Sequence, residues 1–204
     1  NFDGKRYGTI TVRRMIEDSV NTAAVRLAMQ VGLKEVVSAA RDAGIVSPLS
    51  PVPSLSLGSF EVTPVELAYA YATLASGGTR HEPFPLHSII GAKGDTVYAG
   101  KADGRQAVDR RAAYLVSYAL EGVVDRGTAK SARAAGIGFP VSGKTGTTDD
   151  YRDSWFVGYT PEVLCAVWVG RDSGRDTGLT GAAGALRIWN RFMKSVYPAS
   201  GPRA

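Results

Sequence analysis

Two short apolar runs, residues 155–159 and 163–169, lie near the carboxyl end of the chain and are separated only by Thr160-Pro161-Glu162. Such runs, joined by a few turn residues, are typical of an antiparallel β-hairpin. The second run is apolar at every position, which predicts a strand covered on both faces. The rest of the chain is therefore expected to supply elements that cover this hairpin.

Helical spacing of apolar residues predicts the covering elements. One helix is expected to end near Asp18, a second to start near Asn21, and a third to end at Gly44. Residues 63–66 have the pattern of a capping box with proline at the first helical position. Asp109 can cap a further helix, and a last helix closes the chain. The faces expected to be buried are Ala112, Leu115, Val116, Ala119, Leu120 and Val123 in the one, and Leu186, Trp189, Phe192, Met193 and Val196 in the other.

Two segments between these helices carry turn residues instead of a helical pattern. Residues 47–59 hold three prolines and five serines, which predicts an extended connecting loop. Residues 85–99 predict a hairpin around Ala92-Lys93-Gly94-Asp95. The order of elements is a mainly helical part over residues 1–135, followed by strands and a closing helix over residues 136–204. This order predicts a single α+β domain whose antiparallel sheet is covered by helices.

The composition excludes several classes of function. Apolar residues make up 44% of the 204 residues and charged residues 21%, as in soluble globular proteins, and no apolar run approaches the length of a bilayer span. Cys165 is the single cysteine, and the two histidines have no cysteine or acidic helper at ligand spacing, so we expect no metal and no cofactor. The net charge of +5 comes from scattered residues, so we expect no nucleic-acid partner.

Two short polar motifs remain as candidates for chemistry. The first is Ser19-Val20-Asn21, at the expected junction of two helices, and the second is the run of residues 142–148, Ser-Gly-Lys-Thr-Gly-Thr-Thr. Each is weak alone, because a serine at a helix end is usually a cap and Gly-Lys-Thr-Gly occurs by chance. Together and in this order, they suggest the Ser-x-Asn and Lys-Thr-Gly elements of penicillin-recognising serine enzymes.

The second motif has a competing interpretation. Residues 138–145 also match G-x-x-x-x-G-K-[ST], the phosphate-binding loop of NTPases. That loop must follow a buried strand and open a helix. Residues 134–137 are a poor strand and residues 146–150 are poor helix formers. A P-loop NTPase is therefore the least favoured alternative.

Longer segments resemble the transpeptidase domain of class A penicillin-binding proteins. They are residues 18–27, 63–78, 143–148, 153–161 and 167–170. The resemblance covers almost the whole chain, with residues 79–108 the least distinctive. It implies a β-lactamase-like transpeptidase fold.

One element of that family is not found, because no serine in the sequence is followed three residues later by lysine. The resemblance therefore implies that this chain is the C-terminal part of one transpeptidase domain, incomplete on its N-terminal side. The Ser-x-x-Lys nucleophile is expected on an upstream segment, together with strands that complete the sheet. That segment would also anchor the domain at the extracytoplasmic face of the membrane, on its periplasmic or outer side.

The resemblance implies a reaction in which a serine is acylated by the D-Ala-D-Ala end of a peptidoglycan stem peptide and the acyl group then passes to a stem amine. Ser19 would relay protons, Asn21 would hold the substrate backbone and the missing lysine, and Lys144 would supply positive charge. The substrate-binding residues implied are Thr145, Gly146, Thr147 and Thr148, where the hydroxyls of Thr145 and Thr147 bind the carboxylate and the Thr147 N–H forms half of the oxyanion hole.

The same resemblance implies β-lactam antibiotics as covalent inhibitors and little activity of this chain alone. Two further alternatives stay open at the level of sequence. One is a D,D-carboxypeptidase or β-lactam sensor that uses the same motifs. The other is a non-catalytic binding fragment that has kept the fold and lost the chemistry.

Overall fold

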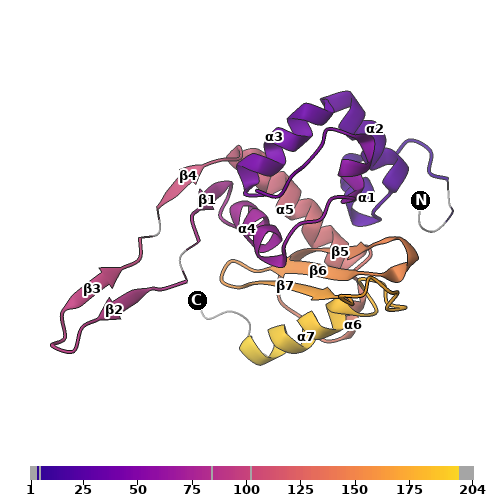
Figure 1. The fold of residues 1–204 in the computed structure, drawn as a ribbon. Helices are drawn as coiled ribbons and strands as arrows, with labels where there is room; N and C mark the ends of the chain where they lie inside the picture. Colours follow the sequence, from indigo (N-terminus) through magenta and orange to yellow (C-terminus); the bar gives the residue numbers. More distant parts are fainter. Residues whose placement is uncertain (1–3, 5, 84, 102, 198–204) are drawn as a thin grey trace.

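The computed structural model describes residues 4, 6–83, 85–101 and 103–197 (Figure 1). The helices are α1 (Val12–Glu17), α2 (Asn21–Val31), α3 (Leu33–Ala43), α4 (Pro64–Ala75), α5 (Arg110–Asp125), α6 (Ser131–Ala134) and α7 (Ala185–Val196). The strands are β1 (Thr79–His81), β2 (Ser88–Ile90), β3 (Thr96–Ala99), β4 (Gly104–Gln106), β5 (Ser142–Thr147), β6 (Ser154–Tyr159) and β7 (Leu164–Val169). Short 3-10 helices lie at η1 (Pro53–Leu57) and η2 (Asp149–Tyr151). The fold is α+β, as the sequence predicts.

The central sheet is antiparallel, in the order β5-β6-β7. Its register pairs Lys144 with Val157 and Trp155 with Trp168. Figure 1 shows α7 on one side of this sheet and α4 and α5 on the other. Helices therefore cover the sheet, and β5, which carries the Lys-Thr-Gly motif, forms one edge of it among the described strands.

The core cluster runs from α5 and α6 to the sheet and α7. Trp189 of α7 is fully buried and meets Phe156 of β6 edge-on, with ring centroids 5.1 Å apart. Its indole N–H donates to the Gly158 carbonyl at 3.3 Å. A Cβ at Gly158 would lie 2.9 Å from the indole ring, so glycine lets the helix approach the strand this closely.

The predicted helix boundaries are confirmed where a local signal marks them. The α1 helix ends before Asp18, α2 begins at Asn21, and Gly44 caps α3. The capping box is complete, because the Thr63 hydroxyl accepts the Glu66 N–H and the Glu66 carboxylate accepts the Thr63 N–H. The two predicted hairpins, β2–β3 and β6–β7, are also present.

Two expectations about the sheet and the connecting loop are wrong. The strand that is covered on both faces is β6 and not β7, whose Trp168 is 40% exposed. The difference arises because β6 lies between two strands, whereas an apolar run does not reveal its place in a sheet. Within the predicted extended loop, Pro53–Leu57 forms a 3-10 helix. Proline can open it because the first helical turn needs no N–H partner.

The predicted buried faces of two helices are correct only in part. In α5, Leu115 is 63% exposed, whereas Ala113 and Val124, which lie outside the predicted face, are buried. In α7, Trp189 and Met193 are buried, but Phe192 is 42% exposed. The buried face of α5 is therefore displaced from the predicted one, whereas the predicted face of α7 is wider than the contact, because Val196 is also exposed.

A two-stranded ribbon that the sequence did not indicate joins the hairpin to the body. Strands β1 and β4 pair antiparallel, with Thr79 opposite Gln106. Figure 1 shows β2 and β3 beyond this ribbon, projecting away from the central sheet as an arm. All residues of β2 and β3 are exposed.

Candidate active site

The turn between α1 and α2 holds Ser19 in an unusual backbone conformation. Ser19 has a φ of 53°, in the left-handed region that residues other than glycine rarely adopt. The N–H of Val20 donates to the Met15 carbonyl at 3.0 Å, and the Val20 side chain is buried. The N–H of Ser19 itself donates to the Ile16 carbonyl at 3.3 Å. These contacts fix the turn around Ser19, and such constrained residues often occur at functional sites.

Lys144 of β5 reaches this turn from the other end of the sequence. Its Nζ donates to Ser19 Oγ at 2.9 Å and to the Thr145 carbonyl at 2.9 Å. Burial lowers the pKa of the Lys144 ammonium from 10.5 to about 8. Among the residues that the structure describes, no carboxylate forms an ion pair with it, so its charge is available to an anionic ligand.

Asn21 lies two residues after Ser19, as the first residue of α2, and is half-buried. The structure thus joins Ser19 and Lys144 directly and places Asn21 on the same short segment. Within the described parts of the chain, no hydrogen bond links the Asn21 side chain to Lys144.

The hydroxyls of β5 differ in what they contact. Thr145 Oγ1 lies 2.6 Å from Thr128 Oγ1. Thr147 Oγ1 accepts the Gly181 N–H at 2.9 Å, which leaves its own proton free to donate. Thr148 Oγ1 accepts the N–H of Asp153 and donates to its carboxylate, at 2.8 and 3.0 Å. The only proton of the Thr148 hydroxyl is therefore used within the β5–β6 turn.

The backbone of β5 alternates between its partner strand and its free edge. The last pair in the β5–β6 register is Thr147 opposite Ser154. One position beyond it, the N–H of Thr148 donates to the Asp153 carbonyl at 3.2 Å, so a hydrogen-bonded position follows directly after Thr147. Because such positions alternate in antiparallel ladders, the N–H of Thr147 points away from β6. Gly146 lies between Thr145 and Thr147, and a Cβ there would lie 3.0 Å from Trp155 Cβ.

A segment after α5, which the sequence did not indicate, joins the two motifs. The N–H of Thr128 donates to the Glu17 carbonyl at 3.1 Å. The Glu17 side chain is buried, and its carboxylate accepts hydrogen bonds from Nε and one Nη of Arg126 at 3.1 and 2.5 Å. Gly127 allows this approach, because a Cβ there would lie 2.3 Å from the Glu17 carbonyl oxygen. A single sequence carries no signal for these contacts between distant residues.

The P-loop alternative is wrong. Lys144 and Thr145 lie inside strand β5, and the residues after them enter the 3-10 helix η2 in place of an α-helix. The phosphate-binding loop would need its lysine at the start of a helix. No group of three or more histidine, cysteine, aspartate or glutamate residues able to hold a metal occurs in the described ranges.

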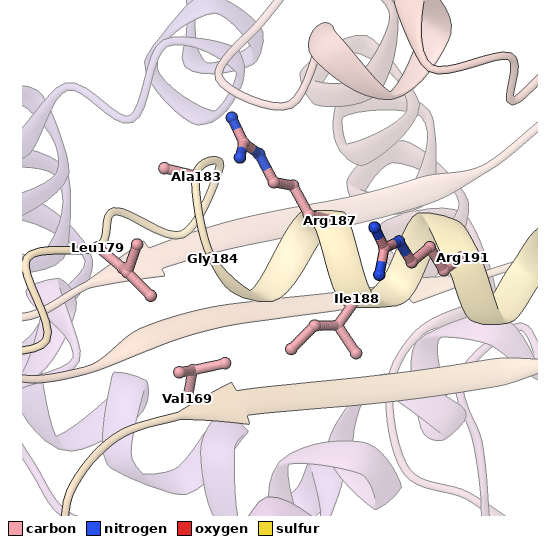
Figure 2. Close-up of a pocket in the computed structure, with 7 residues that line it drawn as sticks. All are labelled: Val169, Leu179, Ala183, Gly184, Arg187, Ile188 and Arg191. Carbon is pink, nitrogen blue, oxygen red and sulfur yellow. The ribbon is translucent and has the colours of Figure 1, made fainter.

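A hollow of about 270 Å³ lies elsewhere, between the end of β7 and α7. Figure 2 shows Val169 and Ile188 at its apolar floor, with Arg187 and Arg191 along α7. It contains none of the predicted site residues.

No helix in the described ranges has the length and apolar character required to cross a membrane.

Comparison with known proteins identifies the family. Residues 1–183 match the family described as the penicillin binding protein transpeptidase domain. Penicillin-binding protein 1B of Vibrio cholerae is 36% identical over 199 residues, which are 97% of this chain and 26% of that protein. The chain therefore spans about a quarter of that relative's length.

Solved structures share the fold. Penicillin-binding protein 1A from Haemophilus influenzae superposes with a TM-score of 0.91 at 21% identity, covering 100% of this chain and 37% of that one. Penicillin-binding protein A from Mycobacterium tuberculosis, in its penicillin G acyl-enzyme complex, superposes with a TM-score of 0.75 at 24% identity, covering 94% and 49%. The fold is thus shared with these structures, and the family match over residues 1–183 shows that the chain belongs to the penicillin-binding protein transpeptidase-domain family.

Proposed function

We propose that the chain is part of a serine D,D-transpeptidase that cross-links peptidoglycan stem peptides through an acyl-enzyme. The observation that carries this proposal is the 2.9 Å hydrogen bond from Lys144 Nζ to Ser19 Oγ, which joins the two family motifs. Because no serine here has lysine three residues later, the acylated serine belongs to a segment outside residues 1–204.

In the proposed acylation, that serine attacks the carbonyl between the two D-alanines, its oxygen bonds to the carbonyl carbon, and the C–N bond breaks. The departing amine must gain a proton. Ser19 Oγ accepts a hydrogen bond from Lys144, so its own proton is free to pass to the amine. Ser19 then takes the proton that the hydroxyl of the nucleophile loses. In the second step, the nitrogen of an acceptor amine bonds to the acyl carbon, the ester C–O bond to the serine breaks, and the amine's proton passes through Ser19 to the serine oxygen. Asn21, on the same turn, is assigned to the substrate backbone.

The groups of β5 are assigned to substrate binding. The Lys144 ammonium and the free proton of Thr147 attract the terminal carboxylate of the donor peptide. The N–H of Thr147 points away from β6, as half of an oxyanion hole requires. A β-lactam carries a carboxylate beside its reactive amide, so the same groups would bind it and the nucleophile would be acylated. Thr148 is assigned a supporting role, since its proton is used by Asp153.

These substrates place the proposed reaction outside the cytoplasm, at the extracytoplasmic face of the membrane, with an anchor on an upstream segment. The proposal requires no metal and no cofactor, because the serine, the lysine and the backbone donors supply the chemistry.

The test is covalent labelling with a fluorescent penicillin. The full-length protein that carries residues 1–204 should be labelled, whereas residues 1–204 alone should not. In the full-length protein, Lys144→Ala should slow labelling by about 100-fold or more, as for the loss of one group that stabilises transition-state charge. Ser19→Ala should slow it as well.

Matched controls are Lys93→Ala in the exposed β2–β3 turn and Ser195→Ala on the exposed side of α7, which should label at the wild-type rate. Absence of labelling in the full-length protein would favour a non-catalytic binding role. Given a donor peptide and an acceptor amine, hydrolysis without a cross-linked product would favour a carboxypeptidase.

A further inference from the structure

We propose that Thr128 is a positioning residue that fixes the Thr145 hydroxyl as a hydrogen-bond donor toward the substrate carboxylate. The inference rests on the proposed function and adds to it a residue outside the family motifs. Its basis is the 2.6 Å contact between Thr128 Oγ1 and Thr145 Oγ1, together with the contacts that hold Thr128 in place.

The contact has two possible proton arrangements, and only one suits an anion. Each hydroxyl has a single proton. If Thr145 donates to Thr128, Thr145 presents only lone pairs to a carboxylate and repels it. If Thr128 donates, the Thr145 proton is free, and a bound carboxylate favours this arrangement because the resulting hydrogen bond is charge-assisted.

Thr147 provides a parallel on the same strand. Its Oγ1 accepts the Gly181 N–H at 2.9 Å, and a backbone amide can only donate. Thr147 is therefore a donor toward any ligand. Thr145 and Thr147 are two residues apart in β5 and share a face. With Thr128 as the donor, Thr145 would be held in the same way as Thr147 is held by the Gly181 N–H.

The backbone of Thr128 is fixed independently of its hydroxyl. Its N–H donates to the Glu17 carbonyl at 3.1 Å, and the preceding Arg126 pairs with the Glu17 carboxylate. Glu17 is two residues before Ser19, whose Oγ accepts from Lys144, the neighbour of Thr145 in β5. A closed ring of contacts thus runs from the Ser19 turn through Thr128 and β5 back to Ser19. Changing the Thr128 side chain removes one hydroxyl and leaves the backbone link in place.

The experiment compares acylation of the full-length protein by benzylpenicillin and by its methyl ester, which has no carboxylate charge. Thr128→Ala removes the hydroxyl and the methyl group, and Thr128→Ser removes only the methyl group. We expect Thr128→Ala to slow acylation by the acid about 10-fold or more, the effect of losing one hydrogen bond to a charged group. Acylation by the ester should change by less than about 2-fold, since the lost bond is to the carboxylate.

Thr128→Ser should react like the wild type with both compounds, because it retains the donor. Equal slowing with acid and ester would show a structural role and overturn the inference, as would unchanged rates in Thr128→Ala. Should the alanine variant not fold, Thr128→Cys provides the same comparison, since a thiol is a weak donor. A wild-type protein that neither compound acylates would overturn the proposed function itself, which is a different outcome from a selective failure at Thr128.

Discussion

At the scale of single residues, Lys144 links the geometry to a measurable pH dependence. Its ammonium donates to Ser19 Oγ, and burial lowers its pKa to about 8. The charged form predominates below that pH and is lost as the pH rises through it. We therefore expect the acylation rate with benzylpenicillin to fall as the pH rises through about 8.

The measurement is the rate of penicillin acylation of the full-length protein across this pH range. A Lys144→Arg variant is the control, because arginine stays protonated and should show no such fall, whatever its overall rate. A wild-type rate that stays level until the ordinary lysine pKa of 10.5 would contradict the role assigned to the lowered pKa.

At the scale of secondary-structure elements, Glu66 ties the start of α4 to the preceding loop. Its carboxylate accepts the N–H groups of Thr63, Val46 and Ser47 at 2.9, 2.9 and 2.6 Å, and the hydroxyls of Thr63 and Ser47. The hydrogen bond from the Thr63 N–H, followed by the one from the Ser47 hydroxyl, lowers the pKa of Glu66 from 4.5 to about 2. The carboxylate therefore stabilises the fold above its unfolded-state pKa, and this contribution is lost as the pH falls from 4.5 through about 2.

We expect Glu66→Gln to lower the free energy of unfolding at neutral pH by roughly 1–3 kcal/mol, because an amide cannot accept all five bonds. Urea unfolding measures the change, and the difference from wild type should shrink toward pH 2. Glu61→Gln, at an exposed position nearby, is the matched control. A loss of stability that does not depend on pH would contradict the assignment to the carboxylate.

The elements also show what the sequence could and could not reveal. The capping box of Thr63 and Glu66 was predictable because both partners lie within one helical turn. The exposure of Leu115 and Phe192 was not predictable. Periodicity shows that a helix is amphipathic, but it does not show which of its apolar residues contact the rest of the protein. The β1–β4 ribbon was missed for a related reason, since Thr79 and Gln106 pair across a long insertion.

At the scale of the whole molecule, the β2–β3 arm is separate from the core. Its two strands pair with each other, and all residues of the strands are exposed (Figure 1). We expect that replacing residues 88–99 with a two-residue Asn-Gly turn changes the free energy of unfolding by less than about 1 kcal/mol, the usual range for exposed sites. Urea unfolding tests this, and a larger loss would show that the arm supports the core.

Trp189→Ala serves as the positive control, because it empties a fully buried site beside Phe156. This substitution should lower the free energy of unfolding by about 3–5 kcal/mol.

The site as a whole was predictable only through its two motifs. Ser19 and Lys144 were identified from their patterns, and the resemblance to class A penicillin-binding proteins placed them in one family. Thr128 was not identified, because its hydroxyl matters only through Thr145, which no local pattern connects to it. The roles assigned to Ser19, Asn21 and Lys144, and to residues 145–148 of the second motif, stay predictions.

The bond between Ser19 and Lys144 joins residues 125 positions apart. Neither half of the polypeptide, expressed as a fragment, would contain a working version of the site. In the full-length protein, reactivity toward penicillin would thus report on the finished tertiary structure, and in a denaturant titration it should disappear together with the near-ultraviolet circular dichroism signal of this domain.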